Sequence, residues 1–257
     1  MISDYALREV FHFLFLERLL RTLPSGTCVL KGGVNLRLFF RSPRYSEDMD
    51  LDVNDVPVHV LKEKGYRLLA DKAFRRALEA YGIRGIRPSD PSKAKQTQTT
   101  QRFRLQLLNA AGEELPTKVE FSRRAHSSGD VRSETIDRDL ACTYQRLAFV
   151  CPHYSGPSAA LQKLSALAHR KVPQVRDLFD IHILHRGGHL TPPLPRKHLP
   201  HADAERAREN VLSFSWEDFR DQILPFLDEE SRHDYEEPER WALIQSEVLD
   251  LLETHDE

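Results

Sequence analysis

The chain has 257 residues, of which 40% are hydrophobic and 30% are charged, and its formal net charge is −2. This composition is ordinary for a globular protein of one large or two small domains, and it excludes a largely disordered chain. The three cysteines (Cys28, Cys142 and Cys151) form no CxxC motif and lie in no histidine cluster, which argues against a disulfide framework and against a zinc site.

Charge is unevenly distributed along the chain. From Ala202 to the C-terminus 18 acidic residues stand against 5 basic ones, whereas the first 201 residues carry 32 basic and 21 acidic side chains. The asymmetry predicts that the front of the chain meets a polyanion while the acidic tail stays solvated. No stretch approaches the roughly 20 apolar residues that span a bilayer, and the apolar run at 10–16 is too short for a signal peptide. We therefore expect a cytoplasmic protein that does not contact a membrane.

The N-terminal quarter is predicted to alternate helices and short strands. Ser3 can cap an amphipathic helix, and a β-prone run at 27–30 leads through Gly32-Gly33 into a helix at 34–40. Polar and apolar residues then alternate over 47–53, which is typical of a half-buried strand. This period of two places Asp48, Asp50 and Asp52 on one face, and we expect Asp52 to lie at the solvated edge of that strand.

The remaining front part is predicted to add helices and a hairpin. One or two helices are expected over 57–81, an exposed polar loop over 88–100, and a hairpin of strands at 103–108 and 117–121. Residues 126–155 indicate one further strand or helix.

The rest of the chain has a helical pattern. Apolar stripes predict helices near 161–168 and 175–184, a linker through Gly187-Gly188 and 192–195, and about three helices within 203–254. The predicted class is α+β, with an α/β domain containing a mixed sheet over residues 1–150 and a mostly helical domain over 151–257.

Three features of the front part suggest phosphoryl chemistry. Gly32 and Gly33 form a turn between a strand and a helix, Asp48 and Asp50 follow on a strand, and Glu120 lies on a later strand. Alternate residues of a strand project to one side about 7 Å apart, so the two aspartates can hold Mg²⁺, a hard cation that prefers carboxylate oxygens. Glycines let the backbone approach a triphosphate, and the amides at the start of the next helix favour anionic oxygen.

Two motifs in this order resemble a known superfamily. Lys31-Gly32-Gly33-x-x-Leu36 followed by Arg44-x-Ser46-x-Asp48-x-Asp50 resembles the signature of the DNA polymerase β-type nucleotidyltransferases. The closest resemblance is to the AbiEii/AbiGii toxin family, which includes the mycobacterial MenT toxins. That family also has a helix bearing a lysine followed by Arg-Asp-x-x-Asp, which here is Lys163 with Arg176-Asp177-x-x-Asp180. The match spans roughly residues 28–185.

The resemblance implies a polymerase-β-type fold, an activity and a set of site residues. Asp48, Asp50 and Glu120 would bind Mg²⁺, or Mn²⁺ in its place, and Glu120 would take the slot of the carboxylate that activates the attacking hydroxyl. Superfamily members more often have Asp in that slot. Nucleotide contacts would come from Gly32, Gly33, Ser46, Lys163 and Arg176, and Asp177 would organise the catalytic centre. Members transfer nucleotides from an NTP to the 3′ end of tRNA, which blocks aminoacylation, a helical lobe closes the nucleotide cleft, and a cognate antitoxin protein restrains the toxin.

Several side chains have a plainer interpretation beside the functional one. Arg176 and Asp180, at i and i+4, could form a surface ion pair, and His182 and His185 could face solvent. Trp216, Phe219 and Phe226 look like packing residues. A phosphate on Ser46 would place negative charge where the triphosphate binds, so we expect modification there to inactivate the protein.

The basic residues of the front part are candidates for salt-sensitive contacts with tRNA. They are Arg37, Arg41, Arg44, Arg75, Arg76, Arg84, Arg87, Lys93, Lys95, Arg123, Arg124, Arg170 and Lys171.

Two other functions remain open from the sequence. The same metal site could serve a protein side chain or a small molecule as acceptor, or the chain could be a catalytically silent RNA-binding relative. Salt-sensitive labelling of the acceptor favours RNA, because a small acceptor gives little salt dependence. A lack of transfer from any NTP would indicate the silent relative.

Overall fold

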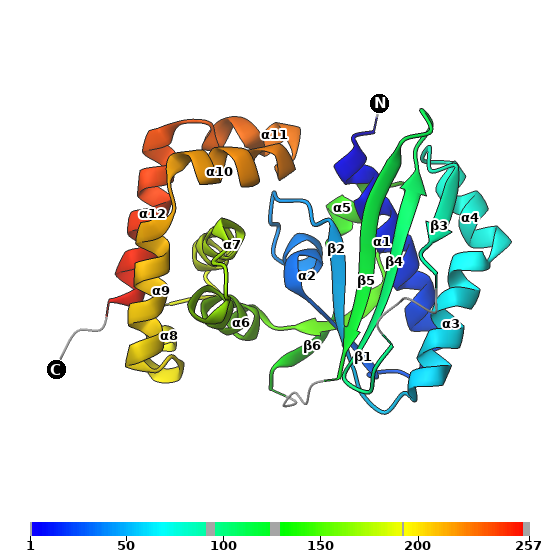
Figure 1. Cartoon of the computed structure of the whole chain (residues 1–257), viewed down its shortest axis with the longest axis horizontal. Coiled ribbons are helices and arrows are strands. Elements are labelled where there is room, and N and C mark those ends of the chain that lie inside the picture. Colours follow the sequence, from blue (N-terminus) through cyan, green and yellow to red (C-terminus); the bar gives the residue numbers. More distant parts are fainter. Residues whose placement is uncertain (1, 91–95, 124–128, 192, 254–257) are drawn as a thin grey trace. The chain divides into compact units, whose positions relative to one another are not determined.

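The computed structural model describes residues 2–90, 96–123, 129–191 and 193–253. The chain divides into two compact units (Figure 1). Unit 1 contains Met1–Phe39 and Tyr45–Tyr154, and unit 2 contains Phe40–Arg44 and Ser155–Glu257. The chain therefore leaves unit 1 for five residues immediately before the predicted metal-binding strand, and then returns to it.

Unit 1 is built on a mixed sheet whose seven strands, in its described part, follow the order β3-β4-β5-β2-β1-β7-β6. In the middle of the sheet β2 runs parallel to β5 and antiparallel to β1, while β1 runs parallel to β7. The strands are β1 (Cys28–Lys31), β2 (Asp48–Val53), β3 (Gly85–Pro88), β4 (Thr100–Leu108), β5 (Glu114–Ser122), β6 (Val131–Thr135) and β7 (Val150–Tyr154).

Helices of unit 1 pack on one face of this sheet. In the figure α1, α3 and α4 lie together on one side of the central strands (Figure 1), and their apolar side chains share a core with Met49, Leu51, Phe103, Val119 and Phe121 from β2, β4 and β5. The helices are α1 (Asp4–Thr22), α2 (Gly32–Phe39), α3 (Val58–Ala70), α4 (Lys72–Glu79) and α5 (Arg138–Thr143).

The other face of the central strands is polar, because side chains alternate along a strand. The core residues occupy the odd positions of β2, β4 and β5, so the even positions lie on the opposite face. We call this opposite side the polar face, defined by Lys31, Asp48, Asp50, Asp52, Arg102, Arg104, Lys118, Glu120, Ser122 and Tyr154.

Unit 2 is helical in its described part. Ser155 caps α6 by accepting a hydrogen bond from the Ser158 amide, with Pro157 in the first turn, and a capping box of Ser215 and Asp218 starts α10. The helices are α6 (Gly156–His169), α7 (Val175–Arg186), α8 (Pro193–His198), α9 (His201–Ser213), α10 (Trp216–Gln222), η1 (Leu224–Phe226), α11 (Glu229–Arg232), η2 (His233–Tyr235) and α12 (Pro238–Leu252). None of the helices in the described ranges is long and apolar enough to cross a membrane.

The predicted α+β class with a mixed sheet is confirmed, and several local predictions need correction. Residues 193–195, part of the stretch 192–195 predicted as linker, begin helix α8, since proline fits the first turn of a helix. The predicted loop over 88–100 includes the end of β3 and the start of β4, while 91–95 lie outside the described residues.

Asp52 does not lie at a solvated edge but is 2% exposed. It accepts hydrogen bonds from Lys31 at 2.5 Å, from Ser122 at 2.6 Å and from Tyr154 at 2.6 Å. The prediction was wrong because β2 lies between β1 and β5, so that both neighbouring strands supply partners.

The two histidines expected in solvent are also bonded within unit 2. His182 is 1% exposed and lies 2.8 Å from Glu247, while Nδ1 of His185 lies 2.8 Å from the Leu190 carbonyl. Among the predicted packing residues, Phe219 is fully buried and Trp216 and Phe226 are half-buried.

The contact between α3 and β4 gives a test of the packing in unit 1. A Cβ added to Gly65 would lie 2.7 Å from ring atoms of Phe103. We predict that Gly65→Ala destabilises the protein, because overpacking costs about 1–3 kcal/mol, against a helix-propensity gain of about 1 kcal/mol. Urea unfolding measures this, and in a Phe103→Leu background the same substitution should cost less. A stabilised Gly65→Ala single variant would contradict the packing.

Candidate active site

The register of β2 and β5 brings the predicted acidic residues together on the polar face. Asp48 is the register partner of Lys118, and Asp50 is the partner of Glu120. Asp50 also faces Lys31 across the antiparallel pair with β1. Directly opposed residues have Cβ atoms about 5 Å apart, so Asp50 and Glu120 are close neighbours.

Asp48 and Glu120 in this cluster each have a cationic partner. The Lys118 ammonium lies 2.8 Å from Asp48 Oδ2, with both side chains about one third exposed. Arg102 Nε donates to Glu120 Oε2 at 2.5 Å, again with both side chains partly exposed. The pairs are accessible to solvent, so a ligand carrying its own charges can replace either partner.

Position 32 requires glycine for two reasons, its backbone conformation and its closeness to the Asp50 side chain. Its φ of +71° lies in the left-handed region, which favours glycine, and a Cβ there would be 3.1 Å from Asp50 Oδ2. The backbone at Gly32 therefore lies close to the Asp50 carboxylate. Gly33 follows in the first turn of α2. Free amides at a helix start attract anions, which fits the predicted approach of phosphates.

Burial raises the pKa of the Asp50 carboxyl above its ordinary value. The positive charges of Lys118 and Lys31 oppose this rise, while Glu120 and Asp48 add to it. A divalent cation would favour the ionised carboxylate, and oxygen donors suit Mg²⁺ or Mn²⁺.

The donor set fits a metal held by two protein carboxylates. Within the described part of the chain, no group of three or more His, Cys, Asp and Glu side chains converges to hold a metal ion. Mg²⁺ commonly uses one or two carboxylates and takes its other oxygens from water and substrate phosphates, so Asp48 and Asp50 suffice. The place of Glu120 as a third ligand stays a prediction, since Arg102 holds its carboxylate.

The residues before Asp48 are fixed by side-chain hydrogen bonds. Ser46 Oγ, half-buried, donates to the Asp48 carbonyl at 2.8 Å. Thr117 Oγ1 donates to the Glu47 carbonyl at 2.6 Å and lies 2.9 Å from His12 Nε2. Burial lowers the pKa of His12 to about 3, with the charge of Arg8 adding to the effect, so this histidine is neutral at physiological pH. The contact of Ser46 with a triphosphate stays a prediction.

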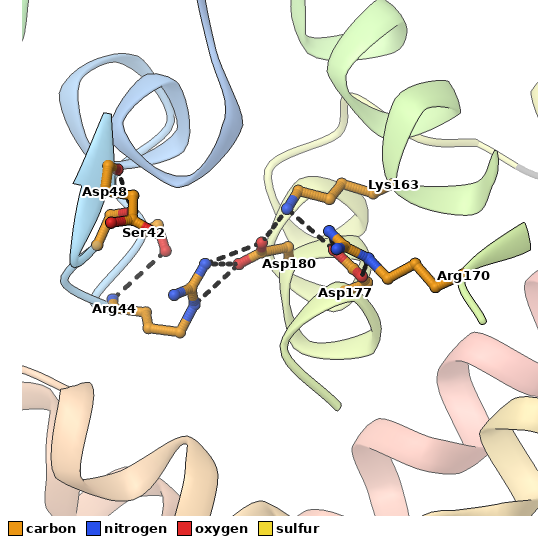
Figure 2. A network of polar contacts seen from close by, with 8 residues as sticks. Ser42, Arg44, Asp48, Lys163, Arg170, Asp177 and Asp180 are labelled. Atoms are coloured by element: carbon orange, nitrogen blue, oxygen red, sulfur yellow. Dashed lines mark hydrogen bonds and ion pairs between the residues drawn. The ribbon is translucent and has the colours of Figure 1, made fainter. Parts of the chain in front are cut away.

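In unit 2 the predicted lysine lies in an ionic cluster on α6 and α7 (Figure 2). Lys163 Nζ is 3.1 Å from Asp177 Oδ1 and 2.6 Å from Asp180 Oδ2. Arg170 Nε lies 2.6 Å from Asp177 Oδ2. Both aspartates are fully buried, whereas the Lys163 side chain is 13% exposed. The cluster therefore fixes Lys163 while leaving part of it in reach of solvent.

Asp180 has a second partner, which the sequence did not indicate. Arg44, from the segment 40–44, donates from Nε at 3.1 Å and from Nη2 at 2.9 Å to Asp180 Oδ1, and from Nη2 at 3.0 Å to Oδ2. Burial would raise the pKa of Asp180, but the charges of Arg44 and Lys163 outweigh it and hold that pKa below its ordinary value. The ionised carboxylate thus joins the segment that precedes Ser46 to the lysine of α6.

Two predicted roles change as a result. The expected surface pair of Arg176 with Asp180 is wrong, because Asp180 is buried against Arg44 and Lys163 and Arg176 is exposed. Arg44, expected to meet nucleic acid, is 6% exposed and engaged with Asp180. No role at the site was predicted for Lys118 or Arg102. The period of two in β4 and β5 could have placed both beside the acidic residues.

Comparison with known structures shows which class of fold this is. The chain resembles JHP933 from Helicobacter pylori, with a TM-score of 0.55 and 18% identity over 98% of this chain and 93% of that one. It also resembles MenT4, a nucleotidyltransferase toxin from Mycobacterium tuberculosis H37Rv, with a TM-score of 0.63 and 20% identity over 98% of this chain and 85% of that one. At this identity the likeness establishes a shared fold.

The family itself follows from the sequence match. Residues 14–256 match the family described as nucleotidyl transferase AbiEii toxin, type IV toxin–antitoxin system, and the chain belongs to this family. The predicted resemblance is confirmed, and with it a nucleotidyltransferase toxin that uses an NTP and has an antitoxin as partner. No curated protein matches the chain.

The buried ion pair of Arg44 and Asp180 gives a stability test. Removing one partner of a buried pair typically costs about 3–5 kcal/mol, because the other charge is left without compensation. We therefore predict that Arg44→Met strongly lowers the urea midpoint of the full-length protein. Arg67→Met is the matched control, since Arg67 and Glu63 form an exposed pair whose loss costs about 0–1 kcal/mol. Equal losses for the two variants would contradict the assigned role of Arg44.

Proposed function

We propose that this toxin transfers a nucleotide from an NTP to the 3′ acceptor end of tRNA, with Mg²⁺ or Mn²⁺ held by Asp48 and Asp50, and so blocks translation and growth. The observation that carries the proposal is the register of β2 and β5, which sets Asp48 and Asp50 beside Glu120 next to the tight turn at Gly32. Family membership supports the transfer chemistry.

The reaction exchanges a phosphoanhydride bond of the NTP for a new phosphoester bond to the acceptor. The 3′ hydroxyl oxygen of the acceptor forms a bond to the α-phosphorus of the NTP, the bond from that phosphorus to the bridging oxygen breaks, and pyrophosphate leaves with its electron pair. When bound, the divalent cation would stabilise the charge that develops on the phosphate oxygens and on the attacking oxygen. Glu120, whose carboxylate neighbours Asp50, is the base that accepts the hydroxyl proton.

Other residues bind the phosphates. Ser46 and the amide of Gly33 face the triphosphate in this proposal, and Arg176 adds a contact from the start of α7. Lys163 neutralises phosphate charge, and Asp177 holds that lysine in place at 3.1 Å. In the ionic cluster three cations (Arg44, Lys163 and Arg170) oppose two carboxylates, so one positive charge remains for an anionic ligand.

The excess of basic residues in the first 201 positions favours RNA as the acceptor. A protein side chain or a small molecule would use the same chemistry without needing this charge. Loss of acceptor labelling as salt is raised therefore separates RNA from the other acceptors.

Removal of the first metal ligand tests the mechanism. We predict that Asp48→Ala abolishes transfer of label from each of the four NTPs to total tRNA in Mg²⁺, and abolishes growth arrest in cells, because the variant loses one of the two carboxylates that would position the cation against the triphosphate. Asp139→Ala, at an exposed position of α5, is the matched control and should behave like wild type. Circular dichroism checks that both variants fold.

Two outcomes would refute this mechanism. Growth arrest by Asp48→Ala equal to wild type would show that Asp48 is not needed. No labelling of tRNA by wild type with any NTP would remove the proposed reaction.

Charge at Ser46 gives an independent test of the nucleotide site. We predict that Ser46→Glu lowers transfer at least 100-fold, because a carboxylate there repels the triphosphate, while Ser133→Glu on the exposed strand β6 leaves it unchanged. Labelled-NTP transfer measures both variants. Full activity of Ser46→Glu would place the triphosphate elsewhere.

A further inference from the structure

Three basic side chains continue the polar face outward from the acidic pair. The register runs from Asp48 on β2 to Lys118 on β5 and then to Arg104 on β4, and in the next row Glu120 is followed by Arg102. We call Lys118, Arg102 and Arg104 the basic strip. Since neighbouring strands lie about 4.8 Å apart, Arg104 lies about 10 Å from Asp48 across the sheet.

The strip is accessible and carries excess positive charge. The Lys118 side chain is 32% exposed and that of Arg102 is 26% exposed. Arg104 is exposed, and none of the ion pairs found among the described residues involves it. Lys118 pairs with Asp48 and Arg102 pairs with Glu120, so the charge of Arg104 is the excess of the strip.

Packing does not explain these side chains. The apolar residues of β4 and β5 point to the opposite face, where Phe103, Leu105 and Val119 are buried in the core. Exposed ion pairs such as Arg102 with Glu120 contribute little to folding, and Arg104 has no such pair in the described residues. The strip therefore requires an explanation other than stability.

Several basic residues that the sequence suggested for RNA are occupied inside the protein. Arg37 donates to Glu9 at 2.8 Å, Arg44 to Asp180 at 2.9 Å, and Arg123 to Gln101 at 2.6 Å. Lys93, Lys95 and Arg124 lie outside the described residues. Arg76 is exposed, but it lies on α4, which packs on the apolar side of the sheet.

We propose that the basic strip binds the phosphates of the RNA acceptor strand and leads its 3′ end to Asp48 and Asp50. This inference rests on the proposed function, of which it names the acceptor surface. Guanidinium groups match phosphate geometry with two parallel donors, and Arg104 has its donors available. Cations on two neighbouring strands fit an extended polyanion, whereas a small acceptor bound at Asp48 would not reach Arg104.

Equilibrium binding of labelled RNA tests the strip without requiring catalysis. Full-length protein is titrated into fluorescently labelled total tRNA without NTP, and anisotropy is followed over a range of salt concentrations. Arg104→Gln should weaken binding about 5-fold at low salt and reduce the slope of log K against log salt by about 0.7–0.9, the contribution of one phosphate contact. Arg76→Gln, the matched control on α4, should bind like wild type.

The outcomes separate the strip from the proposed reaction. If Arg104→Gln binds tRNA with the affinity and salt slope of wild type, the proposed role of the basic strip in RNA binding is contradicted, even when wild type transfers nucleotides. If Arg104→Gln binds weakly while wild type labels no acceptor, the strip stands and the proposed reaction fails. A loss for Arg76→Gln equal to that for Arg104→Gln would move the RNA surface to the other face and overturn the inference.

Discussion

The parallel pairing of β2 with β5 is the constraint on which the candidate site depends. It sets Asp48 beside Lys118 and Asp50 beside Glu120, while the residues between them enter the core. A slip of one residue would turn every one of these side chains to the other face. Met49, Leu51 and Val119, all fully buried, oppose such a slip because it would move them out of the core. Burial of the apolar side chains thus fixes the register of β2 and β5, and with it the positions of the polar side chains on the other face.

Charges in unit 2 are arranged on a different principle. Asp177 and Asp180 are fully buried, and a buried carboxylate is tolerated only with close cations and hydrogen bonds. Arg44 supplies these from the segment 40–44, and Lys163 and Arg170 supply them from α6 and its C-cap. The positive charges of these three side chains offset the cost of burying the aspartates, and the ion pairs hold the Lys163 ammonium in one position.

Local patterns in the sequence were sufficient to predict strand β2 and the face on which its acidic residues lie. The period of two gives both the strand and its faces, and the left-handed turn at Gly32 requires a residue that the sequence supplies. Partners far apart along the chain could not be predicted, as Arg44 and Asp180 show, being 136 residues apart. The burial of Asp52 was mispredicted for a related reason, since alternation does not reveal whether a strand is central or at an edge. Strand β3, which has four residues and includes Gly85 and Pro88, gives too short a pattern to detect.

Direct observation of a metal tests the central claim, that Asp48 and Asp50 together hold a divalent cation beside the nucleotide. Crystals grown with Mn²⁺ and a non-hydrolysable NTP would show its position through anomalous scattering. We expect a manganese peak that both carboxylates coordinate, with the Lys118 ammonium displaced from Asp48. A peak that neither aspartate coordinates, with Lys118 still paired to Asp48, would contradict it.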